Sequence, residues 1–125
     1  MANREGVYGM RERHWFKDRF GNCIGSEQDG RYYDRHGRCL GQRGSGGFYS
    51  DSHSHCIGRD RRDSYYNERG EYTGRHKNGN YYDRHGRQTG YSSDGSYRDS
   101  HGHTTGYYSR GGGRTFGIFK RFFGR

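Results

Sequence analysis

The chain contains no proline, and its aliphatic side chains are scarce. Among its 125 residues, Leu, Ile and Val occupy only five positions: Val7, Ile24, Leu40, Ile57 and Ile118. A composition this polar, combined with a net charge of +9, is typical of disordered chains, because little apolar surface is available to offset the entropy lost on folding. No apolar run is long enough to predict a transmembrane helix, which requires about eighteen residues.

Signals for export and for catalysis are lacking as well. The first ten residues hold no apolar run of the signal-peptide kind, so we expect a cytoplasmic protein, with export by a route that needs no such signal left open. The three cysteines are an odd number, which does not suggest a secreted disulfide framework. No Walker loop, dinucleotide-binding fingerprint or HExxH motif occurs, and we therefore expect neither enzymatic activity nor a cofactor.

Aromatic residues and glycines are abundant, with 13 Tyr, 7 Phe and 24 Gly, and they recur at a fixed interval. An acidic or amide residue repeats in steps of 16, 17, 16, 16 and 16 residues: Asp18, Asp34, Asp51, Asn67, Asp83 and Asp99. Two residues before each stands an aromatic ring: Phe16, Tyr32, Tyr49, Tyr65, Tyr81 and Tyr97. Three residues after it stands a glycine, replaced once by Ser54: Gly21, Gly37, Gly70, Gly86 and Gly102. Seven residues after it a glycine recurs without exception: Gly25, Gly41, Gly58, Gly74, Gly90 and Gly106. The chain therefore contains six tandem repeats.

Each repeat has the chemistry of a β-hairpin. The Asp-x-x-Gly segment suits a type I turn, in which the Asp side chain accepts hydrogen bonds from turn N–H groups and the Gly takes a positive φ. A second turn follows each closing glycine, as at residues 29–30 and 78–79. Two strands and two turns per repeat predict an all-β chain of about twelve strands, arranged as a β-meander or solenoid-like sheet. The absence of proline agrees with this, because every strand N–H stays available for pairing.

The repeat also predicts where the core lies and how the chain divides. Stacked repeats bring the six aromatic rings into one ladder, which we expect to form the core. We divide the chain into a partial repeat or cap at 1–14, six hairpin repeats at 15–106 and a basic aromatic tail at 107–125. The residue six positions after the turn Asp is apolar in the first three repeats (Ile24, Leu40, Ile57) and Thr in the last three, so we expect stability to be concentrated toward the N-terminal half.

Three cysteines share one column of the repeat: Cys23, Cys39 and Cys56. Stacking of neighbouring repeats could bring these thiols together as a metal site, with histidines nearby. The alternatives are a buried column in which Cys acts as a small hydrophobic residue, which we favour, and a redox cross-link.

The charge is unevenly distributed. Residues 107–125 carry five basic residues and no acid, which is more than half of the net charge. Basic and aromatic side chains alternate in this tail: Arg114, Phe116, Phe119, Lys120, Arg121, Phe122, Phe123 and Arg125. The tail could dock onto a partner or an anionic surface. Alternatively, its Phe residues could fold back to cover the last repeat.

The string Tyr-Tyr-Asp-Arg-His-Gly-Arg occurs at residues 32–38 and again at 81–87. It resembles the Tyr-Asp (YD, RHS-type) repeats of bacterial surface and toxin-shell proteins. A weaker similarity links the Tyr-Tyr-Asp-x-x-Gly hairpin to the aromatic repeats of cell-wall-binding modules. These resemblances imply a β-hairpin array with a shell or binding role, and they imply no particular binding residue.

Three functions are compatible with these features. The first is a non-catalytic structural protein that self-assembles into a multimer or filament, because short strands and few aliphatic residues would leave edges and rings exposed. The second is nucleic-acid binding by the tail and by the second tyrosines of the hairpins, Tyr33, Tyr66 and Tyr82, beside the turn arginines Arg35, Arg38, Arg84 and Arg87. The third is carbohydrate binding by aromatic ledges.

Overall fold

A computed structural model describes residues 12–123 and consists of a single closed sheet. Every strand pairs antiparallel with the next strand along the chain, and the last strand pairs with the first. The strands are β1 (His14–Asp18), β2 (Cys23–Gln28), β3 (Arg31–Asp34), β4 (Cys39–Arg43), β5 (Phe48–Asp51), β6 (Cys56–Arg61), β7 (Ser64–Tyr66), β8 (Tyr72–Lys77), β9 (Asn80–Asp83), β10 (Gln88–Ser93), β11 (Ser96–Asp99) and β12 (Thr104–Tyr108). A 3₁₀ turn η2 (Ser45–Gly47) precedes β5, and the chain ends in helix α1 (Gly113–Ile118) followed by π-helix η3 (Phe119–Phe123).

The expected all-β fold of hairpin-linked strands is confirmed, but the expectation of an open meander or solenoid-like sheet is wrong. The sheet closes into a barrel because β1 pairs with β12, with Phe16 opposite Tyr108 and Asp18 opposite Gly106. The register shifts once in each repeat, as between Tyr32 and Tyr33 of β3 where it pairs with β4. Such bulges increase the twist and bend of a strand pair, and six of them around the sheet favour closure over a flat array.

The two rims of the barrel are formed by different turns. At the rim that we name the Asp-turn rim, the Oδ1 atom of Asp34 accepts hydrogen bonds from the backbone N–H groups of His36 (2.8 Å) and Arg38 (2.9 Å). Gly37 closes this turn with a φ of 83°. The same bonds recur at the other five turn residues, Asp18, Asp51, Asn67, Asp83 and Asp99. At the opposite rim, two-residue turns such as Asp29-Gly30 have positive φ at both positions, as hairpins of type I′ require.

The aromatic ladder lines the inside of the barrel. The rings of Phe16, Tyr32, Tyr49, Tyr65 and Tyr81 are buried, and that of Tyr97 is partly buried. Burial raises the pKa of the Tyr32, Tyr49, Tyr65, Tyr81 and Tyr97 hydroxyls, so these tyrosines stay neutral. The rings point toward the barrel axis, where they meet the C-terminal segment.

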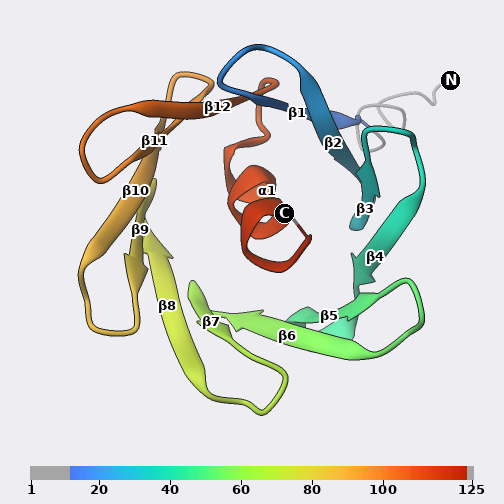
Figure 1. Ribbon diagram of the computed structural model, residues 1–125. Helices are drawn as coiled ribbons and strands as arrows, with labels where there is room; N and C mark the ends of the chain where they lie inside the picture. The colour runs from blue at the N-terminus through green and yellow to red at the C-terminus, as the bar shows by residue number, and fades with distance from the viewer. Residues whose placement is uncertain (1–11, 124–125) are drawn as a thin grey trace, which may run out of the picture.

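The C-terminal segment lies along the axis of the barrel (Figure 1). We name residues 113–123 the plug and the space that they enter the lumen. Phe116 is fully buried, and its ring stacks on that of Phe16 with centroids 5.1 Å apart. Phe123 stacks on Tyr32 at 4.7 Å, and Phe122 stacks on Tyr49 at 4.7 Å. A ring of short strands with few aliphatic residues thus obtains its core from the chain's own tail.

The closing glycines of the repeats form the notches into which the plug fits. A Cβ atom at five of the six would lie 3.0 Å or less from a plug side chain: Gly25 from Phe119, Gly41 from Phe123, Gly58 from Phe122, Gly74 from Arg121 and Gly106 from Phe116. At all six closing glycines a Cβ would also collide with a backbone carbonyl oxygen of the neighbouring strand, which explains why the glycine recurs in every repeat although the turn glycine does not.

Ion pairs hold the beginning of the plug at the opposite rim. Asp60 of β6 is only 3% exposed, and its carboxylate pairs with the guanidinium groups of Arg114 (3.3 Å) and Arg43 (3.4 Å). Arg114 also reaches Asp63 at 3.3 Å, and the Tyr81 hydroxyl donates a hydrogen bond to the carbonyl of Gly113 (3.1 Å). Arg114 therefore anchors the plug to the barrel wall.

The structure corrects the interpretation of the tail as a partner-docking element. The rings of Phe116, Phe119 and Phe123 are buried in the lumen, and Phe122 is partly buried there, so none of them forms an external apolar surface. Of the basic residues, Arg114 is engaged with Asp60, while Lys120 and Arg121 contact rings of the wall. Arg125 lies outside the described residues. The alternative of a tail that folds back describes the structure, with the difference that the tail contacts the ladder residues of all six repeats from inside.

Candidate functional site

The outer surface of the barrel is built from strand positions that alternate with the buried ladder. In β3, for example, Tyr32 points into the lumen and Tyr33 points outward. Two classes of side chain dominate these outward positions, which we name the outer wall. Its cations are Lys17, Arg31, Arg59, Arg61, Arg75, Lys77 and Arg98. Its aromatic residues are Trp15, Tyr33, Phe48, Tyr66, Tyr72, Tyr82, Tyr91 and Tyr107.

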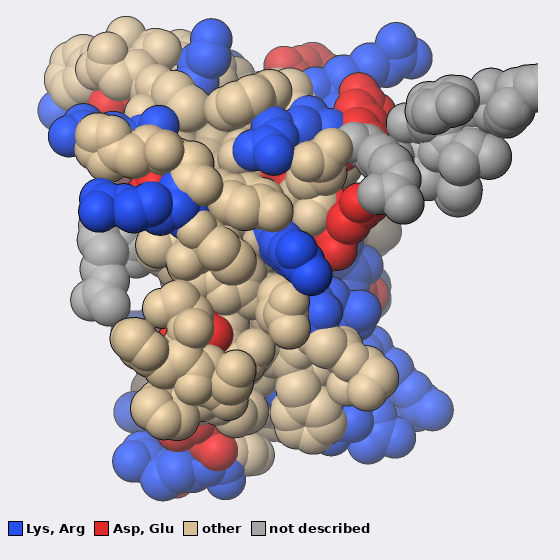
Figure 2. All heavy atoms as spheres, turned by 90° about the vertical axis from the view of Figure 1, so that its right-hand side faces the viewer, with Lys and Arg blue, Asp and Glu red and all other residues tan. Residues whose placement is uncertain are grey.

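No Asp or Glu occupies an outward position of the twelve strands. The acids of the barrel lie elsewhere: Asp60 and Glu27 face the lumen, and the repeat acids cap their own turns at the rim. Those turn hydrogen bonds lower the pKa of the Asp34 carboxylate, as they do for its counterparts in other repeats. The turn acids therefore stabilise their own turns. On the side shown in Figure 2, Lys and Arg are spread among uncharged residues, and acids are fewer. The outward strand positions therefore carry cations and no acids.

Cations and rings of the outer wall are in direct contact. The guanidinium of Arg59 lies 4.4 Å from the centre of the Phe48 ring, and that of Arg75 lies 5.1 Å from the Tyr82 ring. Arg13, just before β1, lies 4.8 Å from the Tyr33 ring. These pairs stand on neighbouring strands, since Arg59 is opposite Phe48 and Arg75 is opposite Tyr82. Such contacts hold the long arginine side chains flat against the wall and leave their charge at the surface.

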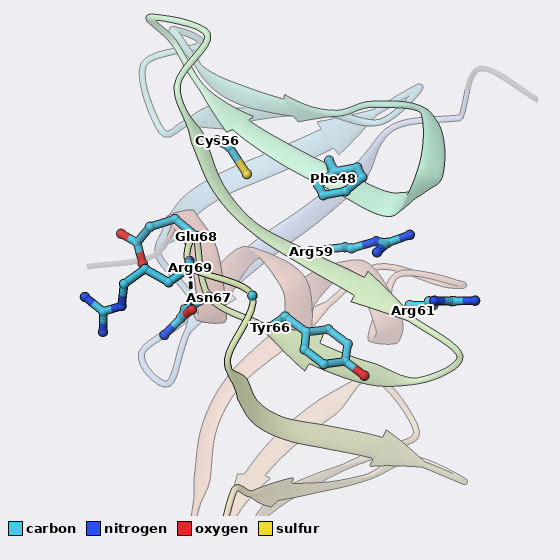
Figure 3. A pocket seen from close by; sticks show the side chains of 9 residues that line it. Phe48, Cys56, Arg59, Arg61, Tyr66, Asn67, Glu68 and Arg69 are labelled. Atoms are coloured by element: carbon cyan, nitrogen blue, oxygen red, sulfur yellow. Dashed lines mark hydrogen bonds between the residues drawn. The ribbon is translucent and has the colours of Figure 1, made fainter.

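A hollow of about 450 Å³ lies on the outer wall beside β5, β6 and β7. Figure 3 shows Arg59, Arg61 and Tyr66 extending in the same direction from β6 and β7, with Phe48 on β5 beside them. The turn residues 67–70 form its remaining side, where Glu68 is the one acid among the nine lining residues. This volume falls in the range of about 300–1,000 Å³ that small-molecule sites occupy. The hollow can hold a flat ring against Tyr66 while Arg59 and Arg61 neutralise an attached anion.

The three cysteines lie on the outside of the barrel rather than in its core. Cys39 and Cys56 are exposed, Cys23 is partly buried, and all three are free thiols. Each thiol lies 3.6–3.8 Å from the carbonyl oxygen of the glycine two residues later. Within residues 12–123, no group of three or more His, Cys, Asp or Glu side chains is arranged to hold a metal ion.

The residues that the sequence singled out are separated by the fold. The six ladder rings form the inside of the barrel, and the turn residues form one rim. Tyr33, Tyr66 and Tyr82 do lie on the outer wall, but two of the arginines expected beside them are engaged in their own turns. Arg38 pairs with Asp34 at 3.2 Å, and Arg87 pairs with Asp83 at 3.4 Å.

The arginines that accompany these tyrosines were missed by the sequence analysis. They are Arg59 opposite Tyr66 and Arg75 opposite Tyr82, each directly after the closing glycine of a repeat. The available signal was the two-residue alternation of a strand: a position next to an inward glycine faces outward.

Comparisons with known proteins identify no relative. No family model matches the chain, and no curated protein or solved structure matches it either. The similarity to YD repeats and to cell-wall-binding repeats therefore remains one of short motifs. No helix among the described residues has the length and apolar character needed to cross a bilayer.

Proposed function

We propose that the protein is a non-catalytic binding module whose outer wall binds single-stranded nucleic acid. The observation that carries this proposal is the outer wall itself, in which cations stand beside aromatic rings and no outward-facing strand position is an acid. Single strands are bound without sequence readout by this combination, because cations follow the phosphates and flat side chains stack with the bases. The tail has no direct part in this mechanism, since its rings are in the lumen.

The contacts on the wall favour a nucleic acid over a carbohydrate. A neutral sugar needs an open ring face, whereas the guanidinium groups of Arg59 and Arg75 already lie over Phe48 and Tyr82. A nucleobase can stack on a guanidinium plane as well as on an aromatic ring. Its phosphate also neutralises the charge that a sugar would leave unpaired.

The features that favoured self-assembly are absent from the barrel formed by residues 12–123. That hypothesis rested on open sheet edges and a thin core, but every strand is paired on both sides and the plug supplies a core inside the lumen. The exposed rings of Trp15 and Tyr107 line one hollow together with Lys17, and Phe48 contacts Arg59, so cations stand beside these rings and disfavour close contact between two copies. Self-association is thus the competing outcome of the test.

The test is binding of a fluorescently labelled single-stranded oligonucleotide, followed by anisotropy at several salt concentrations. We expect the logarithm of the association constant to fall with the logarithm of salt by about 0.7 per phosphate contacted. The double variant Arg59→Gln/Arg75→Gln should reduce this slope by about 1.4, since two phosphate contacts are lost. Tyr66→Leu should weaken binding by about 1–3 kcal/mol with an unchanged slope, because it removes stacking and no charge.

Arg38→Gln is the matched control, because Arg38 is a turn arginine paired with Asp34. It should leave both the affinity and the slope near those of the unmodified protein. The proposal is wrong if no binding occurs at low salt, or if the wall variants bind as the control does. Light scattering on the same samples reports self-association, and multimers dispersed by the wall variants would favour that competing function.

A further inference from the structure

The plug does not fill the barrel evenly. Five of the six closing glycines have a plug side chain as a close neighbour, and Gly90 is the exception. The three atoms nearest to a Cβ at Gly90 all belong to the wall: the carbonyl oxygen and carbon of Arg98, and the Tyr97 ring at 3.5 Å. The plug therefore leaves the notch at Gly90 unfilled, in the sector between Tyr81 and Tyr97.

This sector contains a hollow of about 250 Å³, lined by Tyr81, Tyr97, Gly117, Lys120 and Arg121. On the side of the plug, Gly117 packs closely against the Tyr81 ring, where a Cβ would lie 2.6 Å from the ring. Lys120 is exposed, so the hollow communicates with solvent. Its volume is below the range of about 300–1,000 Å³ typical of drug-sized ligands, which limits an occupant to a small molecule or ion.

Two cations border the hollow, and neither has an acidic partner. Lys120 Nζ lies 5.6 Å from the centres of the Tyr97 and Phe116 rings. Arg121 lies 4.3 Å from the Tyr65 ring, and its Nη1 donates a hydrogen bond to the hydroxyl of Thr73 at 3.3 Å. No ion pair joins either side chain to an Asp or Glu within residues 12–123.

The lumen acids cannot compensate these charges. Asp60 is shared between Arg43 and Arg114, and Glu27 contacts His14 at 2.7 Å. Burial lowers the pKa of Lys120 and Arg121, with no carboxylate to oppose the effect. The guanidinium of Arg121 is half-buried without a carboxylate partner, and an anion beside it is favoured because buried charges are normally paired.

We propose that the open sector of the lumen binds a phosphate group, held between the ammonium of Lys120 and the guanidinium of Arg121. A phosphate carries up to two charges and several acceptor oxygens, which matches one point-charge donor and one planar forked donor. The site is separate from the outer wall, so it stands or falls independently of nucleic-acid binding. It rests on the geometry of the plug: Gly90 is the one closing glycine with no plug side chain among its nearest atoms, and Lys120 and Arg121 line the hollow beside it.

The experiment is titration of the full chain with inorganic phosphate and, separately, with a nucleoside 5′-monophosphate, by calorimetry and by thermal unfolding. Sodium chloride at equal ionic strength is the reference. We expect saturable binding of one phosphate per chain and a rise of the unfolding temperature beyond that with chloride, because a ligand of the folded state stabilises it. Preference for the monophosphate would assign the site to a phosphomonoester, and preference for inorganic phosphate would assign it to the free anion.

Lys120→Met should weaken phosphate binding at least tenfold, because it removes a charge-assisted hydrogen bond. Arg19→Met is the control, since Arg19 is an exposed residue of the Asp-turn rim, outside both the lumen and the outer wall. It should bind phosphate as the unmodified protein does. Failure of phosphate to bind, or equal affinity of the two variants, would overturn the proposal. Loss of oligonucleotide binding with phosphate binding retained would instead count only against the function of the outer wall.

Discussion

Replacing Phe116 by Ala tests whether the tail forms the core of the barrel. The Phe116 ring is fully buried and lies 5.1 Å from the ring of Phe16 and 5.3 Å from that of Tyr97. Truncation of a buried Phe to Ala typically costs about 3–5 kcal/mol, and each lost aromatic pair adds about 0.5–1.5 kcal/mol beyond area burial. We therefore expect a loss near the upper end, about 4–5 kcal/mol.

That loss is large compared with the stability of a small domain, which is about 5–15 kcal/mol. It can be measured by equilibrium unfolding in urea, with the fluorescence of the single tryptophan, Trp15, as the signal. Phe20→Ala is the matched control, because Phe20 is 74% exposed and its removal should change stability by no more than about 0.5 kcal/mol. If Phe116→Ala is as mild as Phe20→Ala, the plug does not occupy the lumen and the packing argument fails.

Two further predictions concern the repeat. Gly25→Ala should lower the free energy of unfolding by several times the roughly 1 kcal/mol expected for Gly21→Ala. The reason is that a Cβ at Gly25 would lie 2.6 Å from the Phe119 ring, whereas at Gly21 only the positive φ is unfavourable. Equal costs in urea unfolding would contradict the notch geometry. The free energy of unfolding should also decrease as the pH falls below about 4. The turn hydrogen bonds lower the folded-state pKa of Asp34 and its counterparts below the unfolded value of 3.8. The contribution of these carboxylates to stability is therefore complete above pH 3.8 and is lost as the pH falls through the folded-state pKa. Replacing these Asp residues by Asn, as Asn67 already does in one repeat, should flatten the acid dependence, and an unchanged pH profile would show that the turn acids do not cause it.

The sequence predicts the hairpins because their determinants are local. Asp-x-x-Gly and Asp-Gly segments fix the two turns of each repeat through φ and short-range hydrogen bonds, and the alternation between them fixes which residues face inward. Closure of the sheet depends instead on the sum of twist and bulge over all twelve strands and on the pairing of β1 with β12. No single repeat encodes that sum, which is why an open sheet was an equally reasonable expectation.

For a related reason, the sequence did not decide whether the tail docks onto a partner or folds back onto the repeats. Alternating basic and aromatic side chains suit an interface as well as a core, and only the closed lumen distinguishes them. One signal did point inward. The apolar column of the first three repeats, Ile24, Leu40 and Ile57, packs against the core to which Phe119, Phe122 and Phe123 contribute. The Thr residues of the later repeats correspond to the side on which Lys120 and Arg121 lie. The polarity change that led us to expect unequal stability therefore matches the asymmetry of the plug.

The outer wall was only half predictable. The second tyrosines of the hairpins follow directly from the repeat, but their cationic neighbours come from the next strand and depend on register. Without that register, the turn arginines were expected to lie beside the tyrosines because they are nearest to them in the sequence. The phosphate-sized hollow in the lumen could not be predicted at all, because it exists only where six repeats surround a plug with five matching side chains.

The most direct test of the closed and plugged barrel is an NMR measurement of nuclear Overhauser contacts between the rings of Phe16 and Phe116. These residues are a hundred positions apart in the chain, yet their ring centres are 5.1 Å apart. The structure predicts strong contacts between their ring protons, together with contacts across β1 and β12 between Phe16 and Tyr108. A tail whose Phe rings show no contacts to the ladder, beside a first strand with no partner in the last, would contradict the account.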